Sequence, residues 1–181
     1  MKEICEKLRN NQIGIIEHDT LPGIVGIATQ ENAKKIQQIK QRSESKGFIL
    51  LIPNTDHLNQ LAINVSETTK ELINSYWPGP LTIIMEKHPN ISPLITGSNT
   101  TIAIRYPKHP ILSELLTTLG QPLLSTSANI SGETGISNQL LNAVDFTCGN
   151  IQKTEANIAS TIIDATQTPF KILRNGSIKL K

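Results

Sequence analysis

The sequence has 181 residues, a length that fits one compact domain and leaves little room for two. Hydrophobic residues make up 38% and charged residues 18%, a balance typical of a globular protein and not of a disordered chain. Lys and Arg number 17 against 15 Asp and Glu, so the net charge of +2 is too small to predict a polyanion partner. Aromatic residues are only 3%, which disfavours a surface that stacks one nucleic-acid base after another.

Hydrophobic periodicity predicts helices and strands that alternate along the whole chain. No repeat or linker divides them, so we expect a single α/β domain over residues 1–181, built on a large, twisted, mixed sheet with helices packed around it. In chain order, the predicted elements are a helix around residues 4–8, strands at 14–16 and 23–27, a helix at 31–42, a strand at 48–52, helices at about 54–61 and 66–76, strands at 81–85 and 102–106, a helix at 110–119, a strand at 122–126, a helix near 138–144, and strands at 161–164 and 171–173.

Cysteine usage and apolar runs indicate the compartment. Cys5 and Cys148 are far apart and belong to no C-x-x-C motif, so we expect free thiols rather than a zinc site or a disulfide. The N-terminus lacks the apolar stretch of an export signal, and the longest apolar run, 48–52, is far short of the ~20 residues of a membrane span. We therefore expect a cytoplasmic protein without a membrane segment.

The familiar nucleotide, hydrolase and metalloprotease signatures are missing: there is no G-x-x-x-x-G-K-[ST], G-x-G-x-x-G, G-x-S-x-G or H-E-x-x-H. The four histidines, His18, His57, His88 and His109, lie far apart without i,i+4 pairing. The sequence therefore predicts no protein metal site, and any nucleotide must be bound without a P-loop.

Three cations, Lys40, Arg42 and Lys46, lie at the end of one predicted helix and in the turn after it. They could simply be a solvated last turn that complements the helix dipole. They could also form a phosphate clamp, with Arg as a bidentate fork and Lys as a point charge. The residues of this segment alone do not decide between the solvated helix end and the phosphate clamp.

A second polar segment, Ser125 to Gly132, places four hydroxyls and an amide directly after an apolar strand. It could be an ordinary turn with Ser/Thr and Asx caps, or a cradle of backbone N–H groups for an anion or small polar ligand.

Arg105 interrupts another apolar strand, and Asp164 ends a third. Burying Arg105 unpaired would be costly, so a carboxylate partner from substrate or protein is expected.

As an ordered set, the motifs resemble the YrdC/TsaC family of threonylcarbamoyl-AMP synthases over essentially the whole chain. Asp19–Gly23 is similar to the family's D-T-V-Y-G, although the segment from Glu17 lacks the family's preceding Pro-Thr pair and has Pro22 where the family has Tyr. The remaining matches are 39–42 with K-x-R, 76–82 with W-P-G-P-L-T, 104–107 with V-R-x-P, 124–132 with S-x-S-A-N-x-S-G, 160–164 with S-T-I-[IV]-D, and 172–176 with I-L-R-x-G.

The resemblance implies a YrdC-like fold with a concave cationic site, in the short bacterial form without an extra C-terminal domain. It implies that L-threonine, bicarbonate or CO2, and ATP give L-threonylcarbamoyl-AMP and diphosphate. A divalent ion, Mg2+, would arrive with ATP and not in a protein cage. A transferase complex of the TsaD type would use the product to modify tRNA adenosine, and weak tRNA contact by this chain is conceivable within the same scheme.

The resemblance also implies roles for individual residues. Catalytic roles fall to Lys40, Arg42, Ser127 and Asn129. ATP contacts fall to Lys40, Arg42, Lys46, Thr101, Asn129, Ser137 and Arg174, and threonine contacts to Thr20, Arg105, Ser127 and Ser160, with Arg105 as partner of the threonine carboxylate. Because Arg42 and Asn129 should lie on exposed walls, Arg42→Ala and Asn129→Ala are expected to stop turnover with little loss of stability.

Two alternatives carry different expectations. The same fold could dock double-stranded RNA or tRNA without chemistry, in which case RNA affinity should fall steeply with salt. A related enzyme could use carbamoyl phosphate, as the YrdC-like module of hydrogenase-maturation proteins does, but the zinc-finger-like cysteine motifs of those longer chains are missing here.

Overall fold

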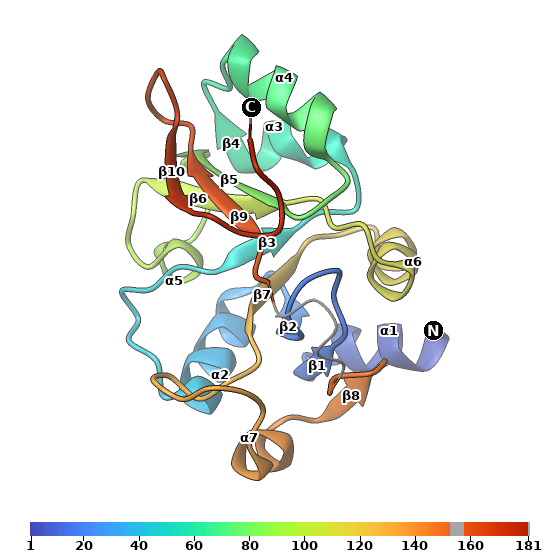
Figure 1. The fold of residues 1–181 in the computed structure, drawn as a ribbon. Helices are drawn as coiled ribbons and strands as arrows, with labels where there is room; N and C mark the ends of the chain where they lie inside the picture. The colour runs from blue at the N-terminus through green and yellow to red at the C-terminus, as the bar shows by residue number, and fades with distance from the viewer. Residues whose placement is uncertain (153–157, 181) are drawn as a thin grey trace.

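The computed structural model describes residues 1–152 and 158–180. Within these ranges, one sheet of ten strands runs in the order β10-β9-β5-β6-β3-β7-β2-β1-β8, with β4 paired to β5 (Figure 1). The β1–β8, β3–β6 and β5–β9 pairs are parallel and the others antiparallel, which confirms the predicted mixed sheet. The strands are β1 Gly14–Ile16, β2 Gly23–Ile27, β3 Ile49–Leu51, β4 Ala62–Ile63, β5 Leu81–Lys87, β6 Thr101–Arg105, β7 Leu123–Ser127, β8 Phe146–Cys148, β9 Thr161–Asp164 and β10 Lys171–Arg174.

The helices cover both faces of the sheet. In Figure 1, α3 and α4 lie near β4 and β5 at one end of the molecule, α2 and α7 lie at the other end, and α1 and α6 lie together at the side. The helical elements are α1 Lys2–Arg9, α2 Gln30–Lys40, the 3-10 helix η1 Thr55–His57, α3 Leu58–Leu61, α4 Glu67–Tyr76, α5 Pro93–Thr96, α6 Pro110–Leu119 and α7 Asn138–Ala143.

Strand alternation divides the core into two apolar clusters. In β1, Ile15 belongs to the larger cluster and Ile16 to the smaller one, and in β3 Leu50 and Leu51 divide in the same way. Because successive side chains of a strand point to opposite faces, the two clusters lie on opposite sides of the sheet. The larger cluster takes its helical residues from α2, α3, α4, α5 and α7, and the smaller one from α1 and α6.

Most predicted elements are confirmed, with a few corrections. The strands at 14–16, 23–27 and 161–164 and the helix at 110–119 have the predicted bounds. The single helix predicted over 54–61 is instead a 3-10 turn followed by the four-residue α3. The strands β4 and β8 and the helix α5 were not predicted, because two to four residues are too few to show a period.

The end of α2 separates two of the predicted site residues. Thr29 caps the start of α2 by accepting a hydrogen bond from the Asn32 amide. Gln41 adopts φ 50°, in the left-handed region, so α2 ends at Lys40 and not at Arg42 as predicted. Lys40 therefore stays on the helix, while Arg42 belongs to the loop that leads to β3.

Over residues 1–152 and 158–180, no helix combines the length and the apolar character needed to cross a membrane. Cys5 is buried and Cys148 partly buried, and both are free thiols.

Candidate functional site

A small polar pocket of about 110 Å³ lies at the ends of several central strands. Its walls come from the loop before β2, from β7, from the end of β6, and from the segments around β9 and β10. The pocket brings together four residues predicted to contact threonine, Thr20, Arg105, Ser127 and Ser160, with Arg174 from the predicted ATP set. The other lining residues are His18, Leu21, Pro22, Gly23, Ile49, Ser125, Thr126 and Ala159.

Arg105 is buried in this pocket, with 3% of its surface exposed. Its guanidinium donates to Thr20 Oγ1 at 3.0 Å and forms an ion pair with Asp19. Burial lowers the pKa of Arg105, and the Asp19 charge opposes that shift. Asp19 is thus the protein carboxylate that the buried arginine required, and the sequence analysis did not single it out.

Asp19 is held from a second side, because the Lys108 amide donates to its Oδ2 at 3.2 Å. Within the described residues, Arg105 Nε is buried without a hydrogen-bond partner. That Arg105 contacts the threonine carboxylate remains a prediction. The guanidinium N–H groups that Asp19 and Thr20 leave unused would donate to that carboxylate.

Arg174 and Ser160 form a second polar unit in the same pocket. Arg174 Nε donates to the Ser160 carbonyl at 2.9 Å, and its Nη2 donates to Ser160 Oγ at 3.0 Å. Ser160 Oγ also lies 2.8 Å from Thr82 Oγ1. These bonds turn an arginine of the exposed strand β10 inward, so that the pocket holds two guanidinium groups, Arg105 and Arg174.

A larger pocket of about 650 Å³ adjoins the small one. The two pockets share two apolar residues, Leu21 and Pro22, and two polar ones, Ser127 and Arg174. The volume falls in the range of pockets for nucleotide-sized ligands. The further lining residues are Ala128, Asn129, Glu133, Thr134, Gly135, Ile136, Ile151 and Gln152.

Lys40 holds the end of β7 and the loop after it in place through hydrogen bonds to residues 127 and 129. Its Nζ donates to the carbonyl oxygens of Ser127 and Asn129, both at 2.6 Å, and to Asn129 Oδ1 at 3.0 Å. The pKa of Lys40 is lowered to about 8, mainly by burial and further by the positive charges of Arg42 and Lys46. With three acceptors for its three donors, Lys40 orders the loop and lines neither pocket.

Asn129 completes this connection. Its Nδ2 donates to the carbonyls of Ile130 at 3.0 Å and Glu133 at 2.8 Å, and its Oδ1 accepts from Ser127 Oγ at 2.5 Å. The polar segment predicted from Ser125 to Gly132 is therefore a tightly bonded turn that also forms a pocket wall.

Arg42 and Thr101 lie together in a neighbouring pocket of about 300 Å³ that shares only Ile49 with the small polar pocket. Arg42 donates to Thr126 Oγ1 at 2.7 Å and to the Gly47 carbonyl, and it lies over the Phe48 ring at 5.2 Å. Arg42 and Asn129 are both half-buried. Both side chains are therefore less exposed than the sequence analysis expected. That they can be removed with little loss of stability stays a prediction, and the hydrogen bonds of Arg42 argue against it.

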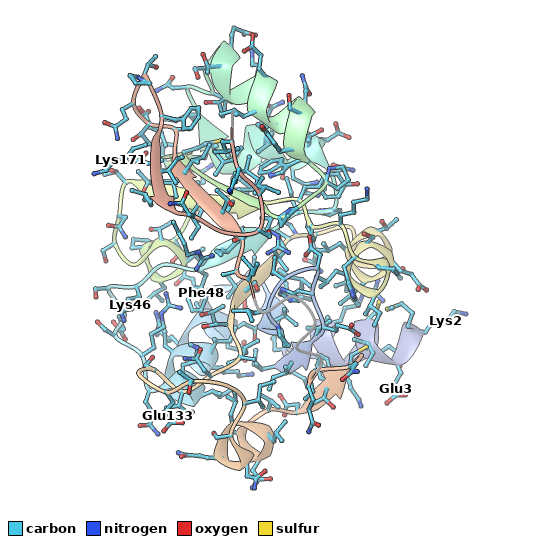
Figure 2. All side chains as sticks on the ribbon, viewed as in Figure 1. Lys2, Glu3, Lys46, Phe48, Glu133 and Lys171 are labelled. Carbon is cyan, nitrogen blue, oxygen red and sulfur yellow. The ribbon has the colours of Figure 1, made fainter. Side chains whose placement is uncertain are left out.

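The other predicted residues have local roles. Ser137 caps α7 by accepting a hydrogen bond from the Leu140 amide at 3.2 Å. Lys46 is exposed on the loop after α2, on the same side of the molecule as Glu133 in Figure 2. Asp164 accepts from the Thr166 amide and hydroxyl in a turn.

In the part of the chain that the structure describes, no three His, Cys, Asp or Glu side chains gather in a way that could hold a metal ion. A nucleotide phosphate could supply such ligands, since Mg2+ is usually bound through substrate phosphates, waters and one or two carboxylates.

Comparison with known proteins identifies the family. The family model Sua5_yciO_yrdC, described as telomere recombination, matches residues 6–176. The chain belongs to the Sua5/YciO/YrdC family. It is 32% identical to a threonylcarbamoyl-AMP synthase of Pyrococcus abyssi over 96% of this chain, and 38% identical to one of Yersinia enterocolitica over 74% of this chain and 72% of that protein.

The family's solved structures agree with the fold. A crystal structure of P. abyssi Sua5 complexed with L-threonine superimposes with a TM-score of 0.90 at 27% identity, over 97% of this chain and 53% of that one. The predicted α/β fold and the resemblance stated from the motifs are thereby confirmed. The chain spans about half the length of the P. abyssi relative, 53% of it.

Proposed function

We propose that this chain is an L-threonylcarbamoyl-AMP synthase, a nucleotidyltransferase acting on L-threonine, bicarbonate or CO2, and ATP. The observation that carries the proposal is the pair of adjoining pockets with Ser127 and Arg174 at their boundary. The small polar pocket, with two guanidinium groups, fits an amino acid, and the larger one fits ATP. The names of the relatives and the threonine complex of Sua5 support the same activity.

The reaction has two bond-forming steps. The threonine amine adds to CO2 and loses protons to give a carbamate. A carbamate oxygen then attacks the α-phosphorus of ATP, the bond to the β-phosphate oxygen breaks, and diphosphate leaves. No protein nucleophile is needed, so catalysis rests on positioning the two substrates and on cations near the developing charge.

The proposal gives each site residue a task. Arg105 and Ser160 would hold threonine, with Thr20 and Ser127, and Arg174 would face both substrates at the boundary. Asn129 would contact ATP, while Lys40 would act mainly by holding the 127–129 backbone in place. Arg42, Lys46, Thr101 and Ser137 remain predicted ATP contacts, of which Arg42 and Thr101 would have to be reached across Ile49.

Mg2+ is proposed to enter with ATP, bound by phosphate oxygens and water. When bound, it would offset negative charge on the phosphates. Glu133 is the carboxylate on the wall of the larger pocket that could face such an ion through water.

The proposed product is a reactive mixed anhydride that must be handed on. A TsaD-type transferase complex acting on tRNA is the proposed recipient, and the activity would then be cytoplasmic. A role limited to RNA docking is not favoured, because the relatives are named as synthases.

Diphosphate release tests the proposed function. The purified chain is incubated with ATP, Mg2+, L-threonine and bicarbonate, and each component is then omitted in turn. Release that requires threonine and bicarbonate together is expected. The matched pair Arg174→Met and Arg9→Met replaces a boundary arginine and an arginine on α1, so only Arg174→Met should reduce the rate. A folded chain that binds ATP but releases no diphosphate contradicts the proposal.

A further inference from the structure

His18 is a buried side chain on the wall of the small polar pocket. Only 7% of its surface is exposed, and within the described residues its Nε2 is buried and makes no hydrogen bond. An unpaired polar atom at this depth costs about 1–3 kcal/mol, so such atoms in native proteins call for an explanation. One explanation is a bound ligand that supplies the hydrogen bond missing at Nε2.

Gly23 and Ser125 show how the imidazole is seated. A Cβ at position 23 would come within 2.8 Å of His18 Nε2 and 3.1 Å of Ser125 Oγ. The absence of a side chain at Gly23 therefore gives the imidazole its place at the start of β2, beside a serine that also lines the pocket.

The surroundings keep the imidazole neutral. Burial, then the charges of Arg105 and His109, lowers the pKa of His18 well below its ordinary 6.5. Asp19 neutralises part of the Arg105 charge, and Glu17 lies 3.8 Å from His109. At neutral pH, His18 therefore presents an uncharged ring that can donate or accept a hydrogen bond, which suits a hydroxyl group.

The division of the two pockets decides which substrate group reaches His18. In the proposed reaction, the amine must face ATP, so it points toward the larger pocket across Ser127 and Arg174. The carboxylate is the group that pairs with guanidinium. His18 lines the small pocket and not the larger one. The side-chain hydroxyl of the amino acid is the polar group left for the unpartnered Nε2.

We infer that His18 is a specificity-determining residue whose Nε2 hydrogen-bonds the β-hydroxyl of the bound amino acid and so selects threonine over its isostere valine. The inference rests on the proposed function and deepens it, since His18 occupies a segment, Glu17 to Gly23, that departs from the family pattern. A pocket with a buried group dedicated to a substrate hydroxyl rejects the analogue that lacks it, because that group is then left unpaired.

The test is calorimetric binding of L-threonine and L-valine to the full chain. The unsubstituted protein should bind threonine at least tenfold more tightly than valine. His18→Ala should weaken threonine about tenfold and leave valine nearly unchanged, so that the ratio falls toward one. His18→Gln, which keeps a hydrogen-bonding group of similar reach, should retain part of the ratio.

His88→Ala is the matched control, because it removes a histidine that lines neither pocket, and it should leave the ratio unchanged. A thermal melt shows whether each variant is folded, and His18→Gln stands in if His18→Ala is not. A global loss of stability cannot change the ratio of two affinities, so a purely structural role is separated from recognition.

An unchanged ratio in the folded His18 variants overturns the inference and leaves the proposed function standing. An equal loss of threonine and valine binding overturns it as well, because it assigns His18 to a group that both amino acids share. If the unsubstituted chain binds neither amino acid, the proposed function fails and the inference fails with it.

Discussion

Lys40 and Asn129 lie 89 positions apart in the chain and are joined by two hydrogen bonds, from Lys40 Nζ to the Asn129 carbonyl at 2.6 Å and to its Oδ1 at 3.0 Å. The bonds connect the last residue of α2 to the loop after β7, where Asn129 forms a wall of the larger pocket next to Ser127, which lines both pockets. The position of the wall therefore depends on a lysine that does not line either pocket.

This connection predicts a cost for Lys40→Met. The substitution removes the three hydrogen bonds that Lys40 Nζ donates, so we expect the free energy of unfolding to fall by about 1–3 kcal/mol. Denaturant titration measures the loss, and Lys34→Met, an exposed lysine of the same helix, should change stability by less than about 0.5 kcal/mol.

A double-mutant cycle of Lys40→Met with Asn129→Ala tests whether the two act as a unit. Residues that share a hydrogen-bond network couple by about 0.5–3 kcal/mol, so the double variant should be more stable than the sum of the single losses predicts. Additive losses would mean that Lys40 supports the fold without Asn129.

The pKa of Lys40, lowered from 10.5 to about 8, predicts a pH dependence of stability. Between pH 8 and 10.5 the unfolded chain binds the Lys40 proton and the folded chain does not. Stability therefore rises with pH in this window. Thermal melts across the window should show this rise as a difference between the unsubstituted protein and Lys40→Met, while Lys34→Met should keep it. Identical pH profiles for all three proteins would contradict the assignment.

The ion pair between Asp19 and Arg105 is predicted to be strongly coupled to folding. Asp19→Asn leaves a buried guanidinium without its charge partner, and breaking a buried pair from one side costs about 3–5 kcal/mol. Replacing both residues with neutral ones should recover much of the loss. Glu67→Gln, in the exposed pair with Lys70, serves as control and should cost less than about 1 kcal/mol.

Arg42→Ala is expected to destabilise the protein by about 1.5–3 kcal/mol, since it removes charged hydrogen bonds to Thr126 and Gly47 and the contact with the Phe48 ring. Arg42→Lys keeps the charge but not the fork and should recover only part. Chemical unfolding of both variants measures the effect, with a substitution of the exposed Arg9 of α1, Arg9→Ala, as control. If Arg42→Ala is as stable as the unsubstituted protein, this prediction is wrong and the contacts of Arg42 add nothing to stability.

The sequence by itself determined the fold class, the longer elements and the family. The short apolar runs at 14–16 and 23–27 and the apolar face closed by Gly120 at the end of α6 are local signals, because they can be recognised from neighbouring residues. The ordered motifs predicted which segments meet, and Thr20, Arg105, Ser127, Ser160 and Arg174 do line one pocket.

Only the tertiary structure decided what these residues touch. The chain order of the strands differs from their order in the sheet, so Asp19 meets Arg105 across 86 positions and Lys40 meets Asn129 across 89. Such pairings follow from which strands and loops become neighbours, and no local period encodes that. The same packing buries His18 against Gly23 and takes Arg42 into a separate pocket, which is why burial and partners could not be derived from the residue types alone.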